Sequence, residues 1–166
     1  MATIHQRITN CLWFDSEAEE AAALYTTIFK NSSIGTITRY GKEGFEFHGK
    51  PEGSVMTVTF NLDGQDFMGL NGGPLFKFNE SMSLIIHCET QEEIDHYWNK
   101  LTENGGQESY CGWLKDKFGV SWQVVTVGWE EMINSPDKKK TSRVLEAMFK
   151  MRKPIIAEFE RAFNAE

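Results

Sequence analysis

Hydrophobic and polar residues in the first half of the chain follow a strand pattern, then a helix pattern, then three further strand patterns. Residues 8–14 are β-prone, and residues 18–29 place apolar side chains at helical spacing. Ser16, with a glutamate three residues later, predicts a capping box at the start of this helix. Asp63-Gly64 is a strong hairpin-turn signal. The three alternating segments that follow the helix span 34–40, 54–62 and 65–70.

The second half of the chain repeats this order. Residues 81–88 predict a strand, and Thr90 with Glu93 forms a second capping-box signature before another helical pattern. Asn104-Gly105 suits the left-handed end of that helix. Strand-like segments follow at 107–113, 114–117 and 120–127. The repetition favours an internal duplication of one βαβββ unit, and the alternative is a generic α+β sandwich whose halves match by chance.

The C-terminal segment departs from the duplicated pattern. Ser135-Pro136 fits a helix start, and Pro154 interrupts two amphipathic helical stretches. Their apolar faces must be buried against the sheets or against a second subunit. We therefore predict a single α+β domain over residues 1–166, with modules at about 8–70 and 81–127 and a helical tail at about 131–164.

Composition restricts the cellular location and the binding partners that we expect for this protein. The net charge of −7 and the pI near 5.2 argue against a nucleic-acid partner, since an acidic protein repels phosphate backbones. The three cysteines lack metal-site or disulfide spacing. The N-terminus has no apolar signal segment, and no apolar run approaches the roughly 20 residues that span a membrane. We expect a cytoplasmic protein with no membrane partner.

Several motifs resemble one known family across nearly the whole chain. They are LWFDSEAEEAAALYTTIF at 12–29, GGPLFKFNESMSLIIHC at 72–88, DKFGVSWQVV at 116–125, MINSPD at 132–137 and AMFKMRKPIIAEFERAF at 147–163. They are similar to the PhnB-like branch of the glyoxalase, bleomycin-resistance and vicinal-oxygen-chelate superfamily, which is often labelled 3-demethylubiquinone-9 3-methyltransferase. The resemblance implies glyoxalase-like paired βαβββ modules that curl around a pocket, and a homodimer.

Metal-dependent members of this superfamily hold a divalent cation with four pocket-facing side chains. The resemblance puts Asn10 at the first of these positions, Ser83 at the position on the fifth strand and Gln123 at the position on the last strand, and the fourth position falls near Met68–Leu70. None of these side chains carries a charge, so they compensate poorly for the dehydration of a divalent cation. We predict no standard metal site and no cofactor. A slip of one residue in this alignment would change which side chains face inward.

The same positions suggest a binding pocket for a small molecule. The candidate lining residues are Asn10, Leu12, Met68, Ser83, Cys111 and Gln123. If Asn10 and Gln123 face the pocket, strand alternation turns Trp13 and Trp122 toward the helices.

Other chemistry has weaker support. Cys111 is the best candidate for a nucleophile, but a small buried residue is the favoured interpretation. Glu80 is a general base only if it is buried, and a loop carboxylate bonded to a backbone amide is favoured instead. No glycine-rich turn joins a strand to a helix in the manner of a doubly wound nucleotide fold, so the methyltransferase label is not expected to reflect chemistry.

Two hypotheses about function stay open. The first is a small-molecule-binding protein with an uncharged pocket. The second is a lyase, isomerase or dioxygenase of the superfamily with a noncanonical metal site. Neither the ligand nor the reaction can be read from these residues.

Overall fold

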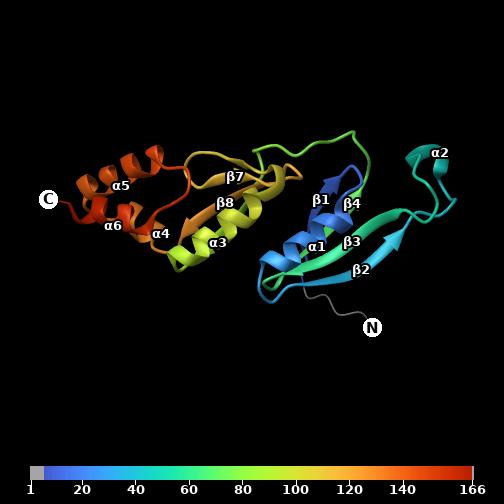
Figure 1. Cartoon of the computed structure of the whole chain (residues 1–166), viewed down its shortest axis with the longest axis horizontal. Coiled ribbons are helices and arrows are strands. Elements are labelled where there is room, and N and C mark those ends of the chain that lie inside the picture. Colours follow the sequence, from blue (N-terminus) through green and yellow to red (C-terminus); the bar gives the residue numbers. More distant parts are fainter. Residues whose placement is uncertain (1–5, 166) are drawn as a thin grey trace. The chain divides into compact units, whose positions relative to one another are not determined.

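The computed structural model describes residues 6–165, and the chain divides into two compact units, Met1–Lys77 and Phe78–Glu166. Each unit is described by itself. Each contains a four-stranded mixed sheet and a helix that covers one face of it, and the second unit also carries the helical tail (Figure 1). This α+β arrangement confirms the predicted fold class. The prediction that the whole chain forms a single domain stays a prediction.

The first unit follows the predicted βαβββ order. Its sheet has the strand order β1-β4-β3-β2, in which β1 runs parallel to β4. The short helix α2 interrupts the chain between β2 and β3. The elements are β1 (Asn10–Phe14), α1 (Ala18–Ile28), β2 (Ser33–Arg39), α2 (Phe45–His48), β3 (Val55–Leu62) and β4 (Gln65–Asn71).

Strand alternation in the first unit separates a covered face from an open face. Apolar side chains of β1, β3 and β4 are buried together with those of α1. Gly69 lets the helix approach closely, because a Cβ atom at this position would lie 3.0 Å from the Cβ atom of Ala18. The buried core residues of this unit are Leu12, Phe14, Ala18, Ala21, Ala22, Tyr25, Ile28, Val58, Phe60, Leu62 and Phe67.

The second unit repeats the arrangement with shorter strands. Its sheet has the order β5-β8-β7-β6, and β5 runs parallel to β8. Trp98 of α3 is buried, as are Leu114 and Trp122 of the sheet. The elements are β5 (Leu84–Cys88), α3 (Gln91–Thr102), η1 (Glu103–Gly105), β6 (Gln107–Glu108), β7 (Trp113–Lys115) and β8 (Ser121–Thr126). The matching order of the two units confirms the predicted repetition.

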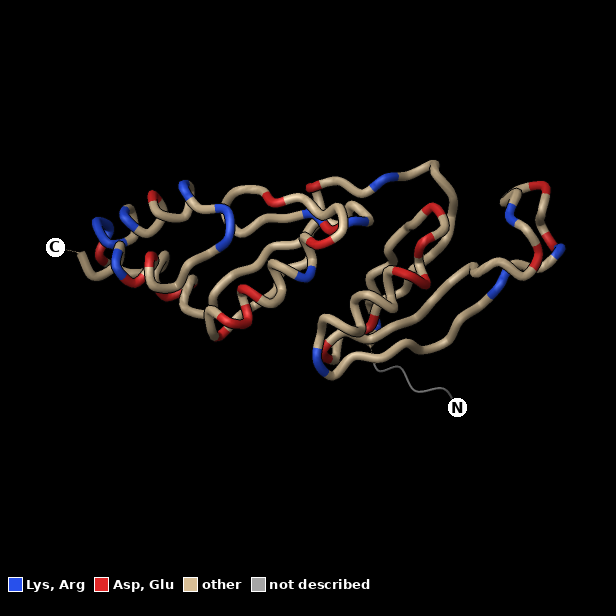
Figure 2. The backbone as a smooth tube through the Cα atoms, viewed as in Figure 1, with Lys and Arg blue, Asp and Glu red and all other residues tan. Residues whose placement is uncertain are grey.

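Three helices form the tail, and they pack mainly on one another. They are α4 (Trp129–Ile133), α5 (Lys138–Lys150) and α6 (Ile156–Asn164). Val144, Met148 and Phe159 form the buried centre, and Trp129 and Cys111 are among the residues packed around it. The apolar side chains at this centre are thus buried within the unit, whereas Phe149 of α5 is 67% exposed. Figure 2 shows that Lys and Arg residues gather on α5, whereas acidic residues line α1 and α3.

Helix starts agree with the sequence in one of three cases. The Thr90 hydroxyl accepts a hydrogen bond from the amide of Glu93, as predicted. The predicted cap at Ser16 is wrong, since α1 starts at Ala18 and the Asn71 side chain accepts a hydrogen bond from the Ala18 amide. The predicted start at Ser135-Pro136 is also displaced, because the Asp137 carboxylate caps α5.

A hairpin turn that the sequence analysis missed divides the predicted strand 107–113. The Trp113 amide donates to the Tyr110 carbonyl, and the central residues Cys111 and Gly112 have φ angles of 60° and 78°. This is the geometry of a type I′ turn. Asp63-Gly64 and Asn104-Gly105 also have positive φ angles, as the sequence predicted. Cys111 escaped notice because a residue that is neither Gly, Asn nor Asp is uncommon in this region.

No helix within residues 6–165 combines the length and the apolar character needed to cross a membrane.

Substitution of Gly112 by Ala should strongly destabilise the second unit. The added Cβ atom would lie 2.4 Å from the Val124 carbonyl oxygen, at a backbone position with a φ angle of 78°. We expect the free energy of unfolding to fall by about 3 kcal/mol. The measurement is urea unfolding followed by circular dichroism. Gly49→Ala is the matched control, since Gly49 also has a positive φ angle but no atom lies within 4 Å of the added Cβ; this variant should lose only about 1 kcal/mol.

Substitution of Asn71 by Ala should weaken the start of α1. Asn71 is buried, and its amide group accepts from Ala18 and donates to the carbonyl of Val55. Its loss removes the partner of the buried Ala18 amide and of the partly buried Val55 carbonyl, so we expect the free energy of unfolding to fall by about 2 kcal/mol in urea unfolding. Asn99→Ala, at an exposed position of α3, should change stability by less than about 0.5 kcal/mol. Equal effects of the two substitutions would contradict this role for Asn71.

Candidate functional site

The open face of the second sheet is the best candidate site. One face of this sheet packs against helix α3. Strand alternation and register place every second side chain of β5, β8 and β7 on the opposite face, which none of the described helices of this unit covers. Ile85 on this face is 52% exposed, although it lies on a strand. The residues of this face are Ile85 and His87 of β5, Gln123 and Val125 of β8, and Trp113 and Lys115 of β7.

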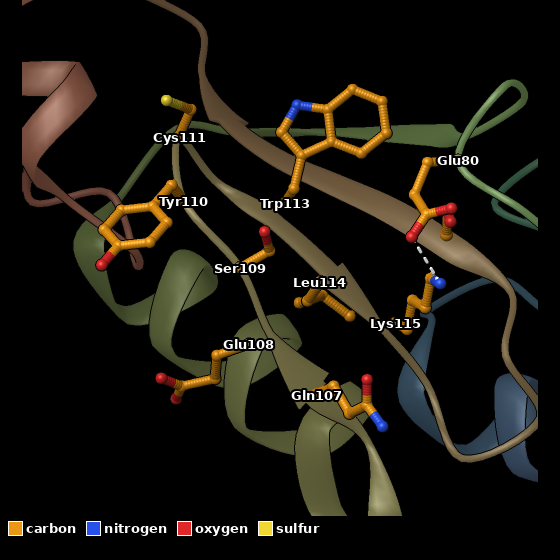
Figure 3. A pocket seen from close by; sticks show the side chains of 10 residues that line it. Glu80, Gln107, Glu108, Ser109, Tyr110, Cys111, Trp113, Leu114 and Lys115 are labelled. Carbon is orange, nitrogen blue, oxygen red and sulfur yellow. Dashed lines mark ion pairs between the residues drawn. The ribbon is translucent and has the colours of Figure 1, made fainter.

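A cleft of about 400 Å³ lies at the β6–β7 hairpin of this sheet (Figure 3). Its volume falls within the range of small-molecule sites, about 300 to 1,000 Å³. The cleft combines an indole ring, a phenol, a thiol, two hydroxyl groups and one ion pair. The lining residues are Glu80, Gln107, Glu108, Ser109, Tyr110, Cys111, Trp113, Leu114, Lys115 and Ser121.

The structure brings the predicted residues Ser83 and Gln123 together. The side-chain amide of Gln123 donates a hydrogen bond of 2.8 Å to the Ser83 hydroxyl. Gln123 is also the register partner of Trp113 across the β7–β8 ladder. A polar pair thus lies next to an aromatic residue that lines the cleft. Trp122 is buried on the opposite face, as alternation from Gln123 predicts.

Cys111 lies between the cleft and the tail. It lines the cleft and also packs against the tail centre around Val144, Met148 and Phe159. The prediction placed it in a strand, which is wrong, because it occupies the hairpin turn. Cys88 has a different role, since burial, together with the nearby Glu93 carboxylate, raises the pKa of its thiol to about 12. Cys88 is therefore an unreactive core residue.

Glu80 has the environment of an ion-paired surface carboxylate. Its Oε1 atom lies 2.5 Å from the Lys115 Nζ atom, and its side chain is 62% exposed. The hydrogen bond from Lys115 lowers the pKa of the Glu80 carboxyl group. The condition for a general base, burial that raises the pKa, is therefore not met.

The first unit places its predicted residues on two different faces. Leu12 is buried under α1, and Asn10 shares that face by alternation. Met68 lies on the other face, where it pairs with Cys11 in the register of β1 and β4. The expectation that Asn10, Leu12 and Met68 line one pocket is therefore corrected. The alignment was out of frame by one residue between the two strands, because Met68 pairs with Cys11 and not with Asn10 or Leu12.

The corrected register points to Thr9 in place of Asn10. Thr9 and Met68 line one cleft of about 390 Å³ in the first unit, together with Thr59, Asn61 and Asp66. Trp13 shares the face of Met68, and its indole donates to the Gly73 carbonyl. The prediction that Trp13 faces the helix fails for the same reason as the prediction for Asn10.

The donor chemistry of these positions does not fit a divalent cation. Thr9 and Met68 in the first unit, and Ser83 and Gln123 in the second, offer no carboxylate and no imidazole. Within residues 6–165, no group of three or more His, Cys, Asp or Glu side chains is placed to hold a metal ion. Neutral hydroxyl, thioether and amide groups repay little of the dehydration energy of such an ion. We therefore derive no chemistry through a metal.

Two further residues of the cleft were missed by the sequence analysis. Trp113 and Lys115 are on the open face, whereas Leu114 between them is buried. The same alternation that assigned Trp122 to the core applies to these three residues. The alternation of exposed and buried side chains was therefore present in the sequence. A strand of three residues between two turns is too short, however, to show from its own sequence which side chains face the core.

Comparison with known proteins identifies the family. Residues 6–125 match the family model described as 3-demethylubiquinone-9 3-methyltransferase. A PhnB protein from Bacillus cereus is 40% identical, with a TM-score of 0.65, over 74% of this chain and 100% of that chain. No curated protein matches.

More distant structures share the fold. Protein PA1353 from Pseudomonas aeruginosa is 18% identical, with a TM-score of 0.58, over 73% of this chain and 97% of that chain. The fosfomycin resistance protein FosX from Listeria monocytogenes is 15% identical, with a TM-score of 0.54, over 80% of this chain and 100% of that chain. With the family model matched over residues 6–125 and a relative that is 40% identical, the chain belongs to the 3-demethylubiquinone-9 3-methyltransferase (PhnB-like) family.

Proposed function

We propose that this protein binds an organic small molecule on the open face of its second sheet and does so without a divalent cation. The observation that carries the proposal is the cleft of about 400 Å³ beside the hydrogen-bonded pair of Ser83 and Gln123. An apolar surface with a few convergent polar groups is the usual composition of a small-molecule site. Here Trp113 supplies the apolar surface, and Gln123 and Ser121 supply polar groups next to it.

The family description does not suggest the chemistry. Nucleotide-type cofactors of methyl transfer bind at the carboxyl ends of parallel strands, beside a glycine-rich turn into a helix. The sheets of this chain are mixed, and the residues directly before α1 and α3 are Ser16-Glu17 and Glu89-Thr90, with no glycine among them. We therefore do not propose methyl transfer.

The alternative is an enzyme of the vicinal-oxygen-chelate type. FosX from Listeria monocytogenes has been crystallised with Mn(II) and dihydroxypropylphosphonic acid, and that form is 15% identical to this chain. Such a likeness concerns the fold. The neutral donors at Ser83 and Gln123 favour binding over metal-assisted chemistry.

Ligand binding should raise the melting temperature and depend on Trp113. A ligand that binds only the folded state at about one hundred times its Kd stabilises by about 2.7 kcal/mol. We expect hits in a thermal-shift screen of aromatic fragments to be lost in Trp113→Ala and kept in Phe47→Ala. Phe47 is the matched control because it is an aromatic residue of the other unit and is 89% exposed. Hits that survive both substitutions would place the site elsewhere.

The same assay tests the alternative. Added Mn²⁺ or Zn²⁺ should give no concentration-dependent stabilisation, and purified protein should carry no stoichiometric metal by elemental mass spectrometry. A clear shift with stoichiometric metal would contradict the proposal and support the enzyme.

We further propose a cytoplasmic homodimer, with a subunit contact on the tail. The family resemblance motivates the dimer, and Phe149 of α5 offers an apolar surface because it is 67% exposed. Phe149→Glu should convert the dimer to a monomer in light scattering, whereas Lys150→Glu beside it should not. If Phe149→Glu is still a dimer, the subunit contact does not involve the tail. If the wild-type chain is a monomer, the proposal of a dimer is wrong.

A further inference from the structure

We propose that the cleft of the second unit selects an aromatic anion, with its ring against Trp113 and its acid group at Lys115. This inference rests on the proposed function and names the chemical class of the ligand. Three features carry it: the indole N–H group of Trp113, which donates to no residue that the structure describes, the position of Lys115 on a paired strand, and the exposed position of Glu80.

Trp113 is placed to serve as the aromatic platform. The indole N–H groups of Trp13, Trp98 and Trp122 donate to Gly73, Glu108 and Asp116, respectively. Within the described part of the chain, Trp113 has no such hydrogen bond, although it is half-buried and lines the cleft. A tryptophan N–H group usually has a hydrogen-bond partner when the ring is buried, as it would be beneath a bound ligand. A ligand that stacks here finds both a ring face and a donor.

Lys115 is the fixed charge of the cleft. Its backbone belongs to β7, which is paired with β6 on one side and β8 on the other. Its side chain is only 31% exposed and points toward Glu80 in Figure 3. By alternation it shares the open face with Trp113, two residues earlier. An acid group that reaches Lys115 therefore leaves the rest of its ligand beside the indole ring.

Glu80 is the counterion of Lys115, and a bound anion could replace it. It lies in a turn outside the strands, and its side chain is 62% exposed. An exposed ion pair contributes at most about a fivefold factor to an equilibrium, so a stronger or better-placed anion displaces it readily. Glu80 can then turn into solvent without leaving a buried charge.

The second carboxylate of the cleft does not oppose an anion at Lys115. Glu108 is the register partner of Leu114, which is buried on the covered face. Its Oε1 atom accepts a hydrogen bond of 2.8 Å from the Trp98 indole of α3. Figure 3 shows Glu108 directed away from Trp113 and Glu80. On the open side of the cleft, the charged lining residues are therefore Lys115 and its mobile partner Glu80.

The test compares three probes that share a two-ring aromatic body: naphthalene sulfonate, naphthylmethanol and naphthylmethylammonium. Isothermal titration calorimetry with the full chain should show tightest binding for the sulfonate, about tenfold weaker binding for the alcohol and the weakest binding for the ammonium. Higher salt should weaken only the sulfonate markedly.

Substitutions at the ion pair and at Trp113 test separately the roles of the Lys115 charge and of the indole ring. Lys115→Met should reduce the affinity for the sulfonate to that for the alcohol and leave the alcohol unchanged. Glu80→Gln should raise the affinity for the sulfonate by up to about fivefold, because it removes the competing anion. Trp113→Ala should weaken all three probes. Both charge variants should keep the wild-type melting temperature within about 2 °C, since the carboxylate partner of the pair is 62% exposed and such a pair contributes little to stability.

The outcomes distinguish this inference from the proposed function. Absence of binding for every probe would overturn both. Equal binding of sulfonate and alcohol, with no effect of Lys115→Met, would overturn the anion selectivity and leave the small-molecule site. Preference for the ammonium would also overturn it, and would assign Glu80 rather than Lys115 to the ligand.

Discussion

The left-handed turn at Cys111-Gly112 is the constraint on which the second unit depends. The amides of Cys111 and Gly112 donate to the carbonyl groups of Met151 and Arg152, between the two long helices of the tail. The Gly112 carbonyl accepts from Val124 in the sheet. Because these backbone groups leave no room for a Cβ atom, only glycine fits at the second position of the turn. Sheet, cleft and tail meet at these two residues.

Residues 151–155, which connect α5 to α6, are bonded to α3. Gln91 of α3 donates to the Pro154 carbonyl and accepts from the Ile156 amide, and Lys153 lies 2.6 Å from Asp95. The Lys153 hydrogen bond lowers the pKa of the Asp95 carboxyl group. The tail is thus held by backbone and side-chain bonds at both the turn and α3. These bonds hold the buried centre of the tail, Val144, Met148 and Phe159, within the unit that carries it.

The division of each sheet into a covered and an open face determines where chemistry is possible. On one face of each sheet the side chains pack against a helix, so they are mostly apolar and not accessible to ligands. The opposite row in the second unit holds Trp113 and Lys115, which line a cleft, and Gln123, which is the register partner of Trp113. This composition favours recognition of an organic molecule by stacking, hydrogen bonding and one charge. It lacks the concentrated negative charge with which proteins hold divalent cations.

The sequence by itself determined the order of the elements, the duplication and the family, because periodicity, capping residues and turn dipeptides are local properties. Thr90, Asp63-Gly64 and Asn104-Gly105 behave as their residue types predict. The frame of β8 was also correct, since Trp122 and Gln123 lie on opposite faces. Tertiary structure alone decided how β1 is aligned with its neighbour β4, where Met68 pairs with Cys11 and therefore lies on the face opposite Asn10 and Leu12, and where the Asn71 side chain of β4 caps α1. It also decided the turn at Cys111, because the carbonyl groups that hold this strained backbone come from the tail, some 40 residues later in the chain. A residue's face and its left-handed backbone depend on partners that are distant in sequence, and no local pattern records them.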